Sequence, residues 1–490
     1  MSTIIVCNNY KKTDYSFRPG ENLLAFLRAR GYTLDAPCGG LGVCGKCRVR
    51  IRIGNETQTV LACKTALWED CTVWLTEDDA DLSWNDAEGG SIHSCAREGY
   101  GVAVDLGTTT VAVSLHDLQS GQLLGSLSEW NAQRGYGGDV ITRIGLCIDR
   151  SDGLDTLGDA IRQQIGRMLD SLCRKHGIAK SGVTEAFLAG NTVMQHIFAG
   201  VSPASIAAAP FIPATYFDDG TPVVLDGLPF RLAPCVAGYV GGDITAGLLS
   251  CDLHTKSGKA LFIDVGTNGE MALGGADGFT ACAVASGPAF EGAGISCGMP
   301  AAFGAINKVE LTDDGLTYEV LGGGEPRGIC GSGILDLCAC LLALGYIDES
   351  GCLEEDEDGE AVFYLTDTVY ITQRDIRQLQ LAKAAVRAGV RLLMQAENVT
   401  FNDLDALYLA GGFGNRLRPE SAVAIGMLPA EMLGKIIPCG NSSLRGAQQA
   451  LLDPAAIDAL RGIKENCTYL ELSSDPNFNE CFVEEMSFPE

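Results

Sequence analysis

The sequence predicts a small α+β domain followed by a larger α/β domain in which one structural plan occurs twice. Three observations predict this architecture. A glycine-rich loop that carries cysteines lies near the start of the chain. Farther along, an apolar strand ends in an Asp-x-Gly-Thr turn at Asp105, and the same pattern returns at Asp264. A third apolar strand runs into a glycine turn at Gly411. A chain of 490 residues has room for two or three domains.

The cysteine loop has the residue types and the spacing of an iron–sulfur site. Five residues separate its first two cysteines and two separate the next pair, so the candidate ligands are Cys38, Cys44, Cys47 and Cys63. Thiolates are soft donors, and four of them close a two-iron, two-sulfide cluster. Glycines reach the left-handed backbone angles of a tight loop, and this loop holds Gly39, Gly40, Gly42 and Gly45. Structural zinc is the alternative, but zinc sites usually show two Cys-x-x-Cys knuckles, and this loop has one.

Through this loop, residues 1–76 resemble the [2Fe-2S] ferredoxin domain, with a first cysteine gap nearer the adrenodoxin type than the plant type. The expected elements follow the same order, with strands near 4–6, 49–51 and 73–75 and a helix over 22–30. The resemblance implies a β-grasp fold, a [2Fe-2S] cluster and one-electron transfer. The other cysteines of the twenty are scattered through apolar segments. We therefore expect one cluster only, with small buried hydrophobic side chains elsewhere.

Charge and hydropathy exclude several classes of partner. The net charge of −27 argues against binding to nucleic acid, because a phosphate backbone repels such a surface. The apolar stretch over 334–347 is too short to span a membrane and contains Asp336. The first residues lack the charged, apolar and small-residue regions of a secretory signal. We therefore expect a cytoplasmic protein that binds neither nucleic acid nor membrane.

An acidic, turn-forming stretch over 77–98 predicts a linker. It separates the small domain from a larger α/β domain that we expect over 99–490. The two Asp-x-Gly-Thr copies divide this larger domain into a first lobe over about 99–256 and a second lobe over about 257–490. Such a duplication is expected to close over one ligand.

The two Asp-x-Gly-Thr turns have a chemical rationale as phosphate-binding sites. Glycine lets the backbone approach a phosphate, and amide and hydroxyl groups donate to its oxygens. The candidate donors are Gly107, Thr108 and Thr109 in the first turn and Gly266, Thr267 and Asn268 in the second. Asp105 and Asp264 would hold Mg²⁺ directly or through water. Glu270 either orients the water for hydrolysis or simply begins the outgoing strand.

A third glycine motif fits the other end of a nucleotide. Gly411, Gly412 and Gly414 follow the apolar strand over 407–410 and precede an expected helix. A turn of this kind lets an adenosine lie flat on backbone, and a helix N-terminus favours anions.

The three motifs in this order resemble the ASKHA superfamily of sugar and acetate kinases, chaperone ATPases and actin. The resemblance implies a duplicated actin-like, ribonuclease H-like fold that binds ATP with Mg²⁺. Gly331 and Ser332, at the start of an apolar helix, resemble the motif that connects its subdomains. A ferredoxin domain ahead of such an ATPase resembles one family, the reductive activators of corrinoid enzymes. Segments such as Gly190–His196 and Gly241–Asp243 extend that resemblance over nearly the whole chain.

That family resemblance implies a function and partners. It implies ATP-dependent reduction of Co(II) to Co(I) in the corrinoid protein of a methyltransferase system. An upstream ferredoxin, flavodoxin or reductase would supply the electron, and the resemblance also implies a homodimer. The alternatives are ATP-gated electron delivery to another low-potential enzyme such as a dehydratase, a non-catalytic redox-sensing ATP-binding protein, and a small-molecule kinase. Dehydratase activators carry a [4Fe-4S] cluster and no ferredoxin domain, and a kinase would leave that domain without a purpose.

Overall fold

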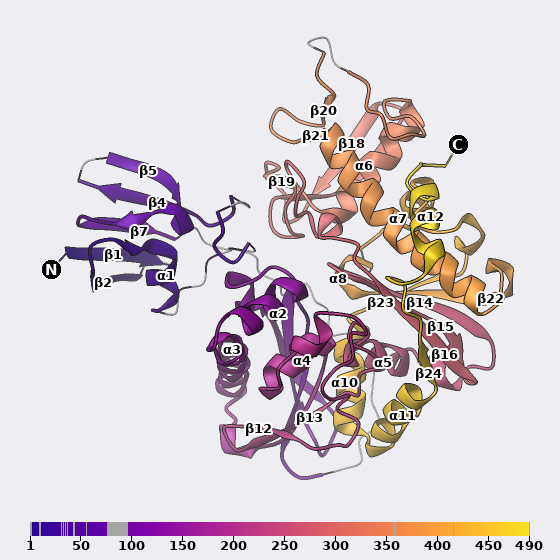
Figure 1. Ribbon diagram of the computed structural model, residues 1–490, viewed down its shortest axis with the longest axis horizontal. Coiled ribbons are helices and arrows are strands. Elements are labelled where there is room, and N and C mark those ends of the chain that lie inside the picture. The colour runs from indigo at the N-terminus through magenta and orange to yellow at the C-terminus, as the bar shows by residue number, and fades with distance from the viewer. Residues whose placement is uncertain are drawn as a thin grey trace.

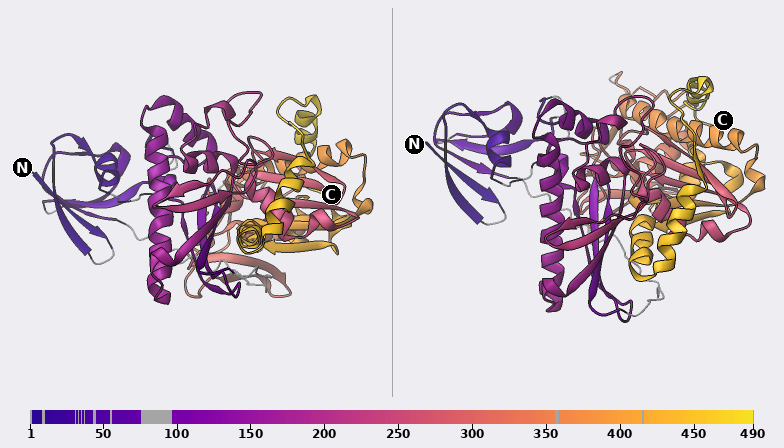
Figure 2. Two further views of the ribbon diagram at one scale, coloured as in Figure 1. Left: turned by 90° about the horizontal axis from the view of Figure 1, so that it is seen from below. Right: turned by 60° about the horizontal axis from the view of Figure 1, so that its bottom comes forward.

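The structure is a computed structural model, and it describes residues 2–8, 11–30, 32, 34, 36, 38–42, 45–54, 56–75, 97–355, 359–414 and 416–489. Figure 1 shows three bodies: an N-terminal domain, a first lobe and a second lobe. In both views of Figure 2 the N-terminal domain lies at one end, beside the first lobe and away from the second. The predicted linker over 77–98 lies almost wholly outside the described residues.

The N-terminal domain is a mixed sheet with one short helix packed on it. The strand order is β2 (Lys11–Phe17), β1 (Ser2–Asn8), β7 (Cys71–Trp74), β4 (Arg48–Ile53) and β5 (Glu56–Leu61), and β3 (Glu21–Asn22) pairs separately with β6 (Ala66–Leu67). The helix α1 (Leu23–Arg28) begins after Asn22, whose side chain accepts a hydrogen bond from the Ala25 amide. Its apolar side is buried against the sheet. The expected β-grasp elements are confirmed, although the helix ends two residues earlier than predicted.

The first lobe is built on a six-stranded sheet. Its order is β10 (Leu123–Trp130), β9 (Thr110–Asp117), β8 (Tyr100–Leu106), β11 (Val183–Gly190), β13 (Leu228–Leu232) and β12 (Val223–Leu225). The helices α2 (Val140–Asp149), α3 (Gly153–His176) and α4 (Thr192–Ala199) form one apolar core with a face of this sheet. Because β8 and β11 are parallel neighbours, their carboxyl ends lie at the same edge.

The second lobe repeats this plan. Its sheet has the order β23 (Ile436–Gly440), β22 (Leu404–Ala410), β14 (Lys259–Val265), β15 (Gly269–Gly275), β16 (Gly278–Val284) and β24 (Cys467–Tyr469). The long helix α7 (Gln373–Ala396) packs on β15 and β16, with α12 (Pro476–Glu484) against it. The helix α7 begins at a reciprocal capping box that Thr372 and Asp375 form.

A smaller unit extends the second lobe. It consists of the sheet β18 (Gly315–Val320), β17 (Ala305–Thr312) and β19 (Gly328–Ile329), the hairpin β20 (Val362–Tyr364) and β21 (Tyr370–Thr372), and the helices α6 (Gly331–Leu344) and α9 (Pro419–Ala424). The start of α6 at Gly331 agrees with the predicted apolar helix.

Among the described helices, none combines the length and the apolar character that crossing a membrane requires.

Two helices lie between the two large sheets. They are α5 (Gly242–Ser250) and α10 (Ser442–Leu452), with α11 (Pro454–Glu465) beside them. A Cβ atom at Gly446 would come within 2.1 Å of the Ala246 carbonyl oxygen, so the two helix backbones touch. One apolar cluster contains side chains of both sheets and of these helices, such as Phe187, Phe262 and Leu451. The lobes therefore share a core, and their Asp-x-Gly-Thr turns face one another.

Candidate functional site

The cysteine loop wraps back on itself at the end of α1. The Cys63 amide lies 3.5 Å from the Cys47 sulfur, and a Cβ atom at Gly40 would lie 3.9 Å from the Cys63 Cβ. The Arg28 side chain interacts electrostatically with both Cys47 and Cys38. Three of the four predicted ligands therefore lie around one small volume. Cys44, the fourth, lies outside the described residues.

The glycines of the loop are required by its backbone. Gly39 and Gly40 have φ angles of +67° and +101°, and a Cβ at Gly40 would be 3.2 Å from the Leu24 side chain. Gly42 and Gly45 also have positive φ. A thiolate donor set on a tight, left-handed glycine loop is the chemistry that an iron–sulfur cluster needs. The residues present fit a [2Fe-2S] cluster.

The first phosphate turn follows β8. Asp105 accepts hydrogen bonds from the Asn441 amide nitrogen at 2.8 Å and the Ser443 hydroxyl at 2.7 Å, both at the start of α10. The turn closes where the Gly107 amide donates to the Thr110 carbonyl at 3.0 Å. The Asp105 carboxylate is thereby fixed at the junction of the two lobes, and burial raises its pKa.

The second phosphate turn follows β14 and lies against the third glycine motif. The motif forms a one-turn helix, α8 (Gly411–Gly414), directly after β22. A Cβ at Gly411 would come within 2.5 Å of the Asp264 carboxylate, whereas one at Gly412 would meet no atom of the described residues within 4 Å. Gly411 therefore permits the close approach of the two motifs, and Gly412 borders open space. Gly414 lies against Leu409 of β22.

Four carboxyl groups from both lobes crowd together at this junction. Burial, together with the charge of Asp105, raises the pKa of Asp264 to about 7. Burial and the charges of Asp264 and Asp105 raise the pKa of Asp243, in the first turn of α5, to about 8. Burial also raises the pKa of Glu270, which lies beside Asp243 and accepts a hydrogen bond from Asn191 at 3.1 Å. Such a concentration of buried carboxylates is unfavourable unless a cation neutralises it.

The carboxyl cluster suits Mg²⁺ that arrives with a nucleotide. Mg²⁺ keeps several waters and usually takes one or two carboxylates together with substrate phosphates. In the described ranges, no set of three or more Cys, His, Asp or Glu side chains could hold a metal ion by itself.

Glu291 bridges the two phosphate turns. Its carboxylate accepts hydrogen bonds from the Thr109 hydroxyl at 3.2 Å and from the Thr267 hydroxyl at 2.9 Å, and those hydroxyls lie 3.3 Å apart. The neighbouring Phe290 stacks on Phe413 of the third motif, with ring centroids 4.9 Å apart. The phosphate donors predicted in each lobe are thus brought together, and a carboxylate takes their hydrogen bonds.

Comparison with known proteins identifies the family. Three family models match in order: a 2Fe-2S iron-sulfur cluster binding domain over residues 8–67, the RACo middle region over 100–256, and the C-terminal domain of RACo, the ASKHA domain, over 258–490. The chain is 34% identical to the corrinoid activation enzyme RamQ of Eubacterium limosum over 78% of this chain and 69% of that protein. The chain belongs to the family of corrinoid reductive activators.

Two further comparisons extend the likeness. A [Co(II) methylated amine-specific corrinoid protein] reductase of Methanosarcina barkeri is 26% identical over 79% of this chain and 77% of that protein. The solved structure of a reductive activator for a corrinoid, iron-sulfur protein matches with a TM-score of 0.71 and 31% identity, covering 100% of this chain and 99% of that one. The predicted fold, a ferredoxin domain followed by an actin-like ASKHA ATPase, is confirmed.

Two acidic residues at the junction were missing from the candidates that the sequence supplied. Asp243 follows Gly241 and Gly242 at the start of a helix, so a signal was present in a segment that already carried the family resemblance. Glu291 ends a short 3-10 helix and does not follow an Asp-x-Gly-Thr turn, so only the fold brings it to the threonines.

The connecting motif occupies a different position from the two turns. A Cβ at Gly331 would come within 1.8 Å of the Phe290 carbonyl oxygen, so this glycine permits close packing behind Glu291. The Ser332 hydroxyl donates to the Asn307 carbonyl at 2.8 Å.

Two further predicted residues, Gly266 and Asn268, close the second phosphate turn, because the Gly266 amide donates to the Asn268 carbonyl at 2.9 Å.

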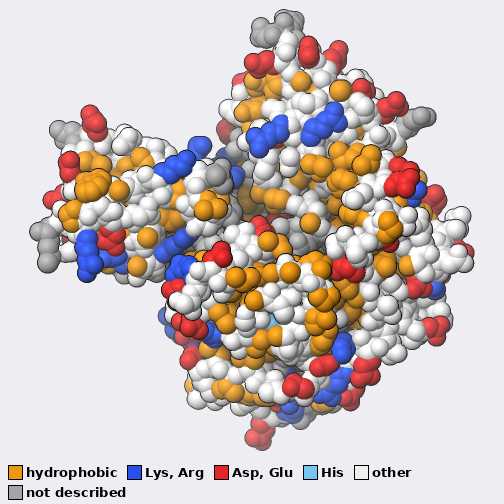
Figure 3. Space-filling view, viewed as in Figure 1, with side chains coloured by type: hydrophobic (Ala, Val, Ile, Leu, Met, Phe, Trp, Pro, Cys, Tyr) orange, Lys and Arg blue, Asp and Glu red, His pale blue; other side chains and the backbone are white. Residues whose placement is uncertain are grey.

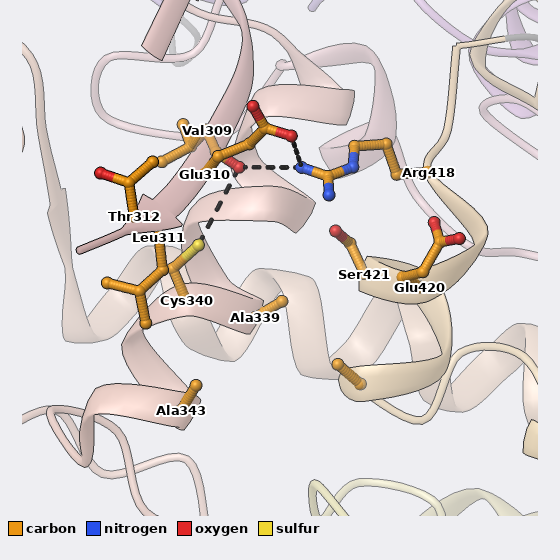
Figure 4. Close-up of a pocket in the computed structure, with 11 residues that line it drawn as sticks. Val309, Glu310, Leu311, Thr312, Ala339, Cys340, Ala343, Arg418, Glu420 and Ser421 are labelled. Atoms are coloured by element: carbon orange, nitrogen blue, oxygen red, sulfur yellow. Dashed lines mark hydrogen bonds and ion pairs between the residues drawn. The ribbon is translucent and has the colours of Figure 1, made fainter. Parts of the chain in front are cut away.

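A surface cavity of about 460 Å³ lies elsewhere, between β17, α6 and α9 (Figure 4). Its one cation, Arg418, pairs with Glu310 at 3.2 Å and lies 3.9 Å from Asp336. Asp336 in turn accepts a hydrogen bond from the Ser421 hydroxyl. Arg418, Glu310 and Asp336 thus have partners within the protein, and the residues of this cavity do not join the carboxyl cluster.

Proposed function

We propose that the protein uses ATP to return the cobalt of a corrinoid methyl-carrier protein from Co(II) to Co(I), one electron at a time. One observation carries the proposal: a single chain joins a thiolate loop for a one-electron carrier to a two-lobed acidic junction with facing phosphate turns. The relatives named above are an activation enzyme and a reductase for corrinoid proteins, which supports the same reaction here.

The residues divide into two sets. Cys38, Cys44, Cys47 and Cys63 would hold the [2Fe-2S] cluster, which supplies the single electron when bound. The acidic set would bind MgATP, with Asp105, Asp243 and Asp264 facing the metal through water. The hydroxyls and amides of the two turns would donate to the phosphates, and Gly411, Gly412 and Gly414 would support the adenosine.

Glu270 has the environment of a residue that positions water for hydrolysis. It lies beside Asp243 and is only 7% exposed, and Asn191 donates to its carboxylate, which fixes its orientation. Because burial raises its pKa, the proximity of Mg²⁺ would be needed to keep it ionised and able to accept a proton.

The energetics explain why a nucleotide is needed. A plant-type [2Fe-2S] centre has a potential near −400 mV, and the Co(II)/Co(I) couple is expected to lie lower. Allosteric coupling of about 1–3 kcal/mol corresponds to roughly 40–130 mV for one electron. Binding alone therefore supplies part of the deficit, and closure of the lobes on ATP is the natural source of the remainder, or of release of the complex.

The remaining partners follow from the same proposal. An upstream ferredoxin, flavodoxin or reductase would reload the cluster, and two copies of the chain would form a homodimer. The protein would work in the cytoplasm, where thiols stay reduced.

The test is reduction of a Co(II) corrinoid protein, followed by its visible absorption, with reduced activator and with or without MgATP. The expected result is fast formation of Co(I) only with MgATP. Equal rates without nucleotide would refute the coupling. Negligible ATP turnover in the presence of both reduced activator and corrinoid protein would favour a sensor instead.

A further inference from the structure

The N-terminal domain touches the first lobe through its cysteine loop. A Cβ at Gly39 would come within 3.0 Å of the Tyr136 carbonyl oxygen. Beside this contact, the Arg28 guanidinium lies over the Tyr136 ring, 5.0 Å from its centroid. The loop that carries Cys38 is therefore docked on the segment between β10 and α2.

Arg28 is placed as a charge for the cluster rather than for a protein carboxylate. Its Nη1 lies 4.0 Å from the Cβ position of Gly40, inside the loop. Its Nε and Nη2 are buried and have no hydrogen-bond acceptor among the described residues. The groups that act on it are Tyr136, Cys47, Arg150 and Cys38, none of which is a carboxylate. Within the part of the chain that the structure describes, Arg28 therefore has no acidic partner.

The surroundings add to the same local field. Lys and Arg side chains gather where the N-terminal domain meets the first lobe (Figure 3). A nearby cation stabilises the more negative, reduced form of an iron–sulfur centre, and hydrogen bonds to its sulfurs act in the same direction. Exclusion of water strengthens both effects. When the domain is undocked, Arg28 loses Tyr136, and water screens its charge.

We propose that Arg28 raises the reduction potential of the cluster while the N-terminal domain is docked, and that Tyr136 is the positioning residue that holds Arg28 in place. The docked protein accepts an electron easily, and the undocked protein is the stronger reductant. This inference deepens the proposed function and rests on the cluster it assigns.

The docking contact is also tied to the first phosphate turn. Arg143 is fully buried, and its guanidinium donates to the Thr108 carbonyl at 2.6 Å and to the Gly137 carbonyl at 3.0 Å. Asn131 donates to the Gly107 carbonyl at 2.8 Å. Tyr136, whose ring faces Arg28, thus lies on a segment that is hydrogen-bonded to the turn that would bind ATP. A nucleotide that moves this turn would change the docking contact and, with it, the potential.

The test is the midpoint potential of the reconstituted protein, measured by a redox titration followed by EPR, without any corrinoid protein. For Arg28→Gln we expect the ratio of reduced to oxidised protein at a fixed potential to fall by about tenfold, a shift of about 59 mV. Arg28→Lys should shift the midpoint potential less than Arg28→Gln, because lysine keeps the positive charge but lacks the planar guanidinium. Arg52→Gln removes an exposed cation from the far part of the same domain and should leave the midpoint unchanged.

A second arm tests docking. Tyr136→Ala lies outside the N-terminal domain and should shift the midpoint in the same direction, and the double variant should shift no more than Arg28→Gln alone. An unchanged midpoint in Arg28→Gln, or an equal shift in Arg52→Gln, would overturn the role of Arg28. An unchanged midpoint in Tyr136→Ala would overturn the role of docking. Because no cobalt reduction is measured, failure here differs from failure of the proposed function.

Discussion

Glu291 stands where the oxygens of a triphosphate are expected, with one threonine of each lobe donating to it. Its carboxylate must lose these hydrogen bonds, or share them, when a phosphate arrives. Like charges at this distance repel strongly in a site with little water. Without a nucleotide, Glu291 therefore keeps the two phosphate turns together.

Glu291→Gln keeps the shape of the side chain and removes its charge. We expect this variant to bind MgATP about tenfold more tightly, a gain of about 1.4 kcal/mol, because the repulsion of the phosphates is relieved. Calorimetric titration with a non-hydrolysable ATP analogue measures this affinity. Weaker binding would instead make Glu291 a ligand of the metal.

The cysteine set also supports a prediction for single residues. Cys63→Ser should abolish the two-iron absorption and EPR signals after anaerobic reconstitution, because an alcohol replaces a thiolate ligand. Cys7→Ser, in β1 of the same domain and away from the loop, should retain both signals. Retention of the full signals in Cys63→Ser would remove Cys63 from the ligand set.

At the scale of elements, the strand-to-turn junctions carry the site. The sequence predicted these junctions well, because an apolar strand that ends in Asp-x-Gly-Thr leaves few alternatives. It could not predict that α10, far along the chain, supplies the partners of Asp105, since Asn441 and Ser443 have no local pattern that marks them. Contacts of that kind depend on the tertiary fold alone.

Gly411 and Gly412 form a matched pair for testing the adenosine motif. Gly411→Ala places a methyl group 2.5 Å from the Asp264 carboxylate at a φ of +83°. That left-handed backbone costs about 1–2 kcal/mol for an alanine. We expect a lower melting temperature and at least about tenfold weaker ATP binding.

The methyl group added by Gly412→Ala meets nothing within 4 Å in the described part of the chain, so the melting temperature without nucleotide should not change. Its methyl group should still weaken ATP binding, because it fills the space over which the adenosine would lie. Undiminished ATP affinity in this variant would show that the adenosine does not rest on this turn.

At the scale of the whole molecule, two lobes are held together across a concentration of acid groups. The folded protein keeps protons on Asp264 and Asp243, whose pKa values are raised to about 7 and about 8. The unfolded chain, with ordinary aspartates of pKa 3.8, has already released them at pH 5. The folded state therefore binds more protons between about pH 4 and pH 8, so stability falls as the pH rises through this range.

We expect the melting temperature without nucleotide to decrease from pH 5.5 to pH 8.5 and MgATP to restore more stability at the higher pH. Asp243→Asn should flatten the slope, because it removes one of the raised carboxyl groups. Scanning calorimetry at several pH values, with the wild type as the reference, measures the slope of melting temperature against pH. An equal slope in the variant would mean that the cluster does not control the pH dependence.

The shared core between the sheets has a consequence for how the chain matures. The helix α10 packs on β8 and β11 of the first lobe, yet it is encoded after almost the whole second lobe. A nascent chain that has left the ribosome only as far as β22 has every strand of the first lobe but not the helix that covers one of its faces. The ferredoxin domain can mature early, whereas the first lobe must wait until α10 has been made.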